Sequence, residues 1–148
     1  MKISTKGRYG LRALLDLATN YNGQYIALKT IAKRLEVSED YLEQVFSILR
    51  KANLVKSIKG HQGGYILTND PSKMTIGSIL RTLEGDLSVV NNTIDEKKYD
   101  NAVDYCLKVN VWDKINKNVN KLIESMTLDD LVNKYKIINH DNSPMFYI

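Results

Sequence analysis

The sequence predicts a mainly α-helical fold with one small β-hairpin. Two short stretches with helical spacing of apolar residues lie within residues 28–50, separated by a tight turn, which is the pattern of a helix-turn-helix. Residues 54–67, LVKSIKGHQGGYIL, then predict two strands around a glycine-rich tip. A long amphipathic segment begins near residue 96. Together these observations predict a winged helix-turn-helix followed by a long dimerisation helix.

Three helices are expected before the hairpin. The first runs from about Gly7 to Asn20, with Ser4 or Thr5 as its cap. The second runs from Leu28 to Leu35. Ser38 caps the third, and acidic residues follow in its first turn, where the helix dipole favours them. The buried face of this third helix is predicted to consist of Leu42, Val45, Phe46 and Leu49.

The hairpin is expected to pair residues 54–58 with residues 64–67, which leaves residues 59–63 as its tip. Because the tip is rich in glycine and has no acidic residue, it can approach another backbone closely. Lys59 and His61 are therefore predicted to enter the narrow, negative minor groove of DNA. The alternative is a purely structural hairpin. A phosphate-binding P-loop is disfavoured, since no Gly-Lys-Ser/Thr sequence opens a following helix.

Helices also dominate the second half of the chain. Thr75 is expected to cap a helix over residues 76–83, and residues 86–95 form a linker. Residues 96–126 then carry a seven-residue apolar repeat, which predicts a seam between two copies of the chain. The alternative is that this helix packs on its own domain. The seam residues are Tyr105, Trp112, Ile115, Val119, Leu122 and Met126.

Thr127 and Asp130 form a capping box that opens a last helix, which reaches about Ile138. These expectations divide the chain into a DNA-binding domain (residues 1–85), the linker (86–95), dimerisation helices (96–138) and a C-terminal tail (139–148). The tail ends on four apolar residues, which is unusual for a frayed end. We expect the tail either to fold back onto the dimer or to bind a partner through Met145, Phe146, Tyr147 and Ile148.

Composition narrows the class of protein. With 43% hydrophobic and 26% charged residues in 148 positions, the chain is expected to be an ordinary globular protein. No apolar stretch approaches the roughly 18 residues of a membrane span, and the start lacks the apolar core of a signal peptide. We therefore expect a cytoplasmic protein with no membrane partner. The single cysteine, Cys106, excludes an internal disulfide and fits a reducing compartment.

An enzyme is the least expected class. His61 and His140 are predicted to lie in a loop and in the tail, and Cys106 has no evident base nearby. No metal-ligand spacing and no nucleophile motif is present in the sequence. We expect neither a metal nor a cofactor.

The charges are distributed unevenly along the chain. Residues 1–68 hold 11 Lys+Arg against 5 Asp+Glu, whereas residues 69–148 hold 10 against 12. A basic half of this kind is typical of proteins that bind the phosphates of nucleic acid. A winged helix that binds only proteins is the competing interpretation, and a shallow salt dependence of binding would favour it.

The third helix is predicted to enter the major groove of double-stranded DNA. Asp40 lies on the outward face of this helix but is not one of the predicted DNA contacts. Gln44 suits adenine, while Ser38 and Tyr41 suit phosphate contacts. Lys6 and Arg8 lie near a helix start, where the dipole disfavours cations, so a DNA phosphate is expected to offset them. The predicted DNA contacts are Lys6, Arg8, Tyr9, Ser38, Tyr41, Glu43, Gln44, Ser47, Arg50, Lys59 and His61.

Three segments carry a resemblance to a known family: MKISTKGRYGLRALLDLA, YLEQVFSILRKANLV and SIKGHQGGYIL. Together they resemble the winged-helix repressors that include the iron-sulfur regulator, the nitric-oxide-sensing repressor and the cysteine-metabolism repressor. The resemblance covers residues 1 to about 85, and the long helix fits it. It implies that Glu43 is the base-reading residue, because a carboxylate accepts from the amino group of cytosine and repels phosphate. The homodimer predicted from the apolar seam implies in turn a pseudo-palindromic operator.

The tail resembles the branch of cysteine-metabolism repressors. Members of this branch are controlled by a complex with cysteine synthase (O-acetylserine thiol-lyase), which binds partners that end in isoleucine. The resemblance implies that the Ile148 carboxylate enters the enzyme's substrate pocket, where O-acetylserine would compete with it. Cluster-binding members of the family carry three cysteines, whereas this sequence has only Cys106. The competing prediction within the family is a redox or nitrosative sensor that acts through Cys106.

Overall fold

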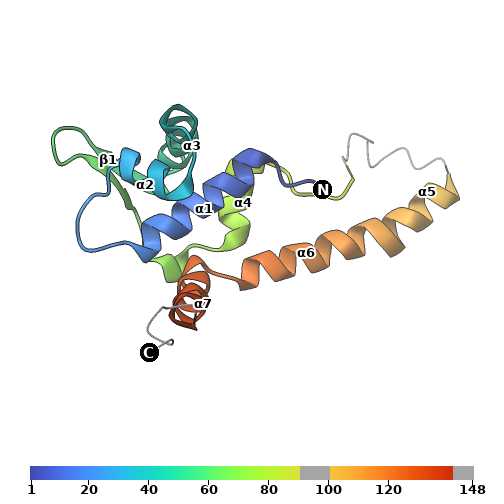
Figure 1. Cartoon of the computed structure of the whole chain (residues 1–148). Helices are drawn as coiled ribbons and strands as arrows, with labels where there is room; N and C mark the ends of the chain where they lie inside the picture. The colour runs from blue at the N-terminus through green and yellow to red at the C-terminus, as the bar shows by residue number, and fades with distance from the viewer. Residues whose placement is uncertain (91–100, 142–148) are drawn as a thin grey trace.

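The computed structural model describes residues 1–90 and 101–141, and Figure 1 shows its arrangement. Helices α1 to α4, the hairpin and α7 form one body, and α5 and α6 project from it as a rod (Figure 1). No helix in the described ranges is both long and apolar enough to cross a lipid bilayer. The elements are α1 (Thr5–Thr19), α2 (Leu28–Leu35), α3 (Glu39–Lys51), β1 (Val55–Ile58), β2 (Gly64–Leu67), a 3-10 turn (Pro71–Lys73), α4 (Ile76–Glu84), α5 (Ala102–Leu107), a π-helical turn (Lys108–Trp112), α6 (Asp113–Ser125) and α7 (Leu128–Asp141).

The mainly α-helical fold with a two-stranded antiparallel hairpin confirms the predicted fold class. Most of the core lies where α1, α3 and α4 meet, and the predicted inner face of α3 is buried in it. Glu36 forms the turn between α2 and α3 in a left-handed conformation with φ of 57°. A glycine is common in such turns, but here a glutamate takes that conformation. The largest side chains at the centre of the core are Phe46, Leu14, Leu17, Ile31, Leu42, Leu49 and Ile79.

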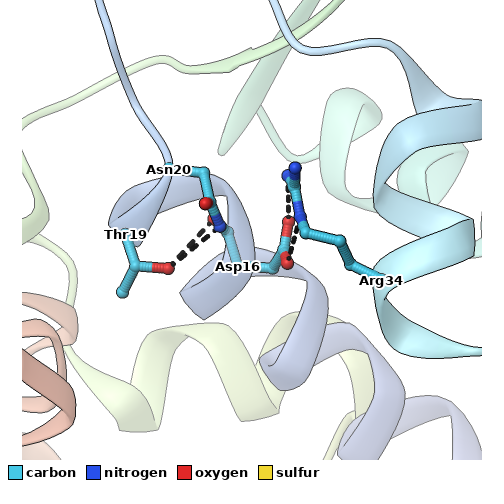
Figure 2. Close-up of polar contacts among 4 residues, drawn as sticks. All are labelled: Asp16, Thr19, Asn20 and Arg34. Carbon is cyan, nitrogen blue, oxygen red and sulfur yellow. Dashed lines mark hydrogen bonds and ion pairs between the residues drawn. The ribbon is translucent and has the colours of Figure 1, made fainter. Parts of the chain in front are cut away.

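One residue of α1 holds α2 in place. The side chain of Asp16 pairs with Arg34 of α2, and its backbone carbonyl accepts a hydrogen bond from Asn20 Nδ2 (2.8 Å) at the end of α1. Figure 2 shows both contacts, together with Thr19. Asp16 therefore accepts the capping hydrogen bond from Asn20 at the end of α1 and ties this helix to α2.

The hairpin is extended by a segment that precedes α2. Within the hairpin, Val55 pairs with Leu67 and Ile58 pairs with Gly64. Ile26 adds a short bridge to Tyr65, with backbone hydrogen bonds of 2.9 and 2.8 Å in the two directions. The wing is thus attached to the helix-turn-helix by backbone bonds as well as by side-chain packing.

The helix caps predicted from the sequence are present in the structure. Ser4 rather than Thr5 caps α1, and the helix begins at Thr5, earlier than expected. Ser38 and Thr75 accept hydrogen bonds that cap α3 and α4. Thr127 and Asp130 exchange backbone-to-side-chain hydrogen bonds of 2.9 and 3.1 Å, as a capping box does. Beyond this box α7 continues to Asp141, so three residues assigned to the tail are helical.

The prediction of one regular helix over residues 96–126 is wrong in two respects. First, the Asn101 side chain accepts from Val103 N–H (2.8 Å), so this capped helix begins at Ala102. Residues 96–100 lie outside the described ranges. Second, Asp113 N–H bonds to the carbonyl of Lys108, five residues earlier, in the π-helical turn. Such a turn holds an extra residue, so the seven-residue repeat does not stay on one straight face.

The end of the rod is joined to the DNA-binding body. Ile76 N–H donates to Met126 O and Leu128 N–H donates to Met74 O, both at 2.8 Å. Arg81 of α4 bonds to Glu124 and Asn120 of α6. Ile123 and Leu128 belong to the same core cluster as α1 and α3. The end of the rod is thus held to α4 by both backbone and side-chain hydrogen bonds.

Candidate nucleic-acid interface

Helix α3 presents polar side chains outward because its apolar face is buried. Its start is fixed by Ser38, whose Oγ accepts from Tyr41 N–H at 3.2 Å. Glu43, Gln44 and Arg50 are exposed on this helix. These residue types carry the donors and acceptors that match base edges in the major groove.

A groove of about 580 Å³ runs along this outward face. It is lined by Asp40, Glu43, Gln44, Ser47, Ile48, Arg50, Lys51 and Tyr65. Four of the predicted DNA contacts thus lie together in this groove, namely Glu43, Gln44, Ser47 and Arg50, whereas Ser38 and Tyr41 do not line it. Sequence reasoning missed Lys51 and Tyr65. Lys51 was detectable as a second cation in the last helical turn, whereas nothing in the strand pattern placed Tyr65 against α3.

Charge is separated along the groove. Asp40 lies in the first turn of α3, whereas Arg50 and Lys51 lie in the last turn. Both placements agree with the helix dipole. The acidic end repels phosphates and the basic end attracts them, so the end that carries Arg50 and Lys51 is the one that suits phosphate contacts.

Two tyrosines connect α1 to the start of α3. The rings of Tyr9 and Tyr41 pack edge to face, with centroids 5.8 Å apart and an interplanar angle of 83°. The Arg12 guanidinium lies 4.9 Å from the centre of the Tyr9 ring and donates to Leu35 O at 3.2 Å. Arg12 is a basic residue that sequence reasoning did not select, although it lies one turn after Arg8 on the same helix. It adds an exposed cation near the predicted phosphate contacts.

The start of α1 already holds an anion from within the chain. Glu84 Oε1 accepts hydrogen bonds from Ser4 N–H (3.0 Å) and from Ser4 Oγ (2.6 Å). Lys6 and Arg8 are exposed in the first turn. Because this carboxylate lies at the positive end of the helix, the dipole no longer requires a phosphate to offset the two cations. The prediction that Lys6 and Arg8 contact phosphates therefore rests only on the exposure of their side chains to solvent.

The wing tip is exposed and basic. Gly63 N–H donates to Gly60 O (3.0 Å), which closes the turn, and Lys59 and His61 project from it into solvent. His61 lines a second groove of about 580 Å³ between the wing and the loop before α2. Lys6, Arg8 and Lys59 line neither groove. Of the predicted contacts, Glu43, Gln44, Ser47 and Arg50 line the α3 groove and His61 lines the second groove.

The described residues contain no group of three or more His, Cys, Asp or Glu side chains that could hold a metal ion. Cys106 is exposed on α5, and Asn110 Nδ2 lies 3.6 Å from its sulfur. An iron-sulfur cluster requires several thiolates, and the sequence holds one cysteine. The one cysteine of the chain therefore cannot supply the ligands of such a cluster.

A helix-turn-helix with exposed base-reading side chains, followed by a basic wing, defines a winged-helix DNA-binding protein. A model of the Rrf2 family, described as iron-dependent transcriptional regulators, matches residues 3–134. The chain belongs to the Rrf2 family and is a transcriptional regulator rather than an enzyme. The family is described as iron-dependent, but this chain has one cysteine and cannot hold an iron-sulfur cluster with cysteine ligands alone.

The regulator CymR of Bacillus subtilis is 42% identical to this chain over 148 residues, which is the full length of both proteins. A solved structure described as CymR, the global cysteine regulator of B. subtilis, superposes with a TM-score of 0.77 at 42% identity and covers 90% of this chain and 98% of its own. The structure of T. potens IscR gives a TM-score of 0.76 at 39% identity, with 99% and 97% covered. The chain is thus similar to members of two branches of the family.

Proposed function

We propose that this protein is a homodimeric repressor of cysteine and sulfur metabolism genes, controlled through a complex with cysteine synthase. The observation that carries the proposal is its 42% identity, over the whole length of both chains, to a regulator described as the global cysteine regulator of B. subtilis. The single cysteine of the chain supports this branch over a branch that needs several thiolates.

The exposed apolar side chains of the rod support the homodimer. Tyr105 is 56% exposed and Leu122 is 58% exposed, and Val103, Leu107 and Val109 of the same rod are exposed as well. Several large apolar side chains exposed to water favour burial against another surface. Val119 and Met126 instead pack on the core of their own chain. The proposed interface therefore lies mainly in the projecting part, and two copies joined there would present their α3 helices to a pseudo-palindromic operator.

Dimerisation is tested by analytical ultracentrifugation at micromolar concentration. The wild type should sediment as a dimer, because several large apolar side chains of the rod are exposed. Leu122→Lys should shift it to a monomer, and Lys121→Ala, a change at the neighbouring exposed position, should leave the dimer intact. A monomeric wild type, with or without DNA, would refute the homodimer.

The C-terminal tail is the proposed input of the signal. Residues 142–148, which include Met145 to Ile148, lie outside the described ranges, so the proposal for them rests on the resemblance. Cysteine synthase binds an amino acid carboxylate beside a small side chain, and the Ile148 carboxylate is proposed to occupy the same pocket. O-acetylserine would then displace the tail and report the sulfur supply.

The test is a titration of cysteine synthase from the same organism into the protein and into a variant that lacks Ile148, with labelled palindromic DNA present. The intact protein should bind the enzyme and gain DNA affinity, the truncated one should do neither, and O-acetylserine should reverse the gain. If neither protein binds the enzyme, the proposed signal is wrong while the DNA-binding role stands. If the complex forms but O-acetylserine does not loosen it, the sensing half fails.

A second candidate signal is oxidation or nitrosation of Cys106. The specific observation in its favour is that this thiol is exposed on α5 rather than buried as a packing residue. An oxidant should then lower DNA affinity of the wild type and leave Cys106→Ser unaffected. An equal response of the two proteins would exclude this candidate.

A further inference from the structure

Tyr65 reaches the α3 groove from the wing strand and not from the recognition helix. Its backbone N–H and C=O are both bonded to Ile26, at 2.8 and 2.9 Å. Its ring packs on the fully buried Phe46 of α3, with centroids 4.4 Å apart. The position of the ring is therefore set by three elements of the fold before any ligand arrives, which lowers the entropic cost of a contact made by its polar end.

The polar end of this side chain is available for binding. The Tyr65 hydroxyl makes no hydrogen bond with any residue in the described ranges, although the side chain is half-buried. Burial raises the pKa of this phenol; the nearby Arg50 lowers it, and Glu43 raises it. The hydroxyl thus stays protonated at neutral pH and can both donate and accept a hydrogen bond.

The neighbours of Tyr65 indicate which part of the DNA it meets. It shares the groove with Glu43, whose carboxylate repels phosphates and suits the amino group of a base. A neutral hydroxyl with one donor and acceptor lone pairs can pair with either kind of group on a base edge. The groove therefore brings together two side chains from different elements, one of α3 and one of β2.

We propose that Tyr65 is a specificity-determining residue whose hydroxyl contacts a base edge beside the one read by Glu43. The proposal rests on the placement of α3 in the major groove. It assigns the wing two separate tasks: the tip contacts the backbone or the minor groove through Lys59, and the strand reads sequence through Tyr65.

The test uses Tyr65→Phe, which removes one oxygen and keeps the ring that packs on Phe46. The probes are a duplex selected by the wild-type protein from a random library and a scrambled duplex of the same composition. By fluorescence anisotropy, the variant should lose about five- to tenfold in affinity for the selected duplex and less than about twofold for the scrambled one. Tyr21→Phe, which removes the hydroxyl of an exposed tyrosine that does not line the α3 groove, is the matched control and should bind both duplexes as the wild type does.

Measuring Glu43→Ala on the same two duplexes tests whether α3 reads bases at all, and so separates an error about Tyr65 from an error about the position of α3 in the major groove. If Glu43→Ala loses affinity selectively and Tyr65→Phe does not, Tyr65 reads no base and the inference is wrong. Equal losses of Tyr65→Phe on both duplexes would likewise overturn it, because they indicate a phosphate contact. If Glu43→Ala also lacks a selective effect, α3 does not read the groove, and the inference fails with that placement. Thermal melting of each variant near the wild-type temperature ensures that folding does not explain the losses.

Discussion

Arg34 binds the Asp16 carboxylate with two guanidinium N–H groups, through Nε at 2.9 Å and Nη2 at 2.8 Å. The Asp16 side chain is 9% exposed and that of Arg34 is 36% exposed, so one partner is nearly buried and the other meets solvent. The hydrogen bond from Arg34 to Asp16 raises the pKa of this guanidinium. Paired, planar contacts of this type are among the stronger ion pairs. This one joins α1 to the first helix of the helix-turn-helix (Figure 2).

Arg34→Ala should lower the free energy of unfolding by about 1 kcal/mol, because it leaves a nearly buried carboxylate without its partner while solvent screens part of the pair. For a chain of this size the loss corresponds to a fall of about 3 °C in melting temperature. Differential scanning calorimetry of the wild type and the variant measures this fall in melting temperature. Lys33→Ala, on the same helix and without an ion-pair partner among the described residues, is the matched control. Equal melting temperatures for the two variants would show that the pair adds nothing.

Glu43→Ala and Lys59→Ala should affect DNA binding differently. Loss of the Glu43 carboxylate should relax base preference, because this group discriminates between base edges and repels phosphate. Loss of Lys59 should weaken binding to all sequences and reduce the slope of log affinity against log salt by about 0.9. Affinities for a selected duplex and a scrambled one, measured over a range of salt, separate the two effects. If both variants lose affinity equally on both duplexes, this division of tasks is wrong.

Gly64→Ala should detach the wing from the segment before α2. A Cβ at this position would overlap the carbonyl of Ile26, which is backbone and cannot move aside easily. We expect a loss of about 2 kcal/mol in stability and faster hydrogen exchange at the Tyr65 amide, whose acceptor is Ile26 O. Gly60→Ala serves as the comparison, since its φ of 116° makes alanine strained there but no atom lies within 4 Å. Unchanged exchange at Tyr65 in Gly64→Ala would contradict this prediction.

The contact between α4 and α6 should depend on pH. Hydrogen bonding from Arg81 lowers the pKa of Glu124 below the ordinary 4.5. Because the folded-state pKa is the lower one, the stabilisation is complete above about pH 4.5 and is lost as the pH falls through the lowered value. Wild type should therefore have a higher melting temperature than Glu124→Gln at about pH 7, and this difference should shrink as the pH falls below the ordinary pKa of a glutamate.

The matched control for this pH dependence is Glu36→Gln, an exposed glutamate without an ion pair among the described residues. It should show no pH-dependent difference from the wild type. A difference between wild type and Glu124→Gln that stays constant from neutral to acidic pH would exclude the Arg81 contact as its cause.

Local chemistry made much of this fold predictable from sequence. The second helix, with bounds Leu28 and Leu35, and the caps at Ser38 and Thr75 were predicted from residues within one turn of each other. The buried face of α3 was also predicted, because its apolar residues repeat at 3.6-residue spacing. The hairpin was predicted by its glycine-rich tip and its apolar strands. Signals of this kind depend only on neighbours in the chain.

Contacts between distant segments were not predictable in the same way. Tyr65 packs on Phe46, Glu84 accepts from Ser4, and Arg34 pairs with Asp16, yet no local pattern marks any of these pairs. The π-helical turn at Lys108–Trp112 also escaped, since the apolar spacing of a regular helix continued across it.

The sequence by itself determined the order of the elements and the polar face of α3. It also placed the single cysteine within a long helical segment. Caps, turns and apolar spacing act over a few residues, so they can be recognised without the tertiary structure. Only the tertiary structure decided that a strand residue joins the recognition groove, that Glu84 occupies the start of α1, and that Val119 and Met126 pack on their own chain. These outcomes depend on which surfaces meet when the core closes, and burial of apolar area depends little on where along the chain that area lies.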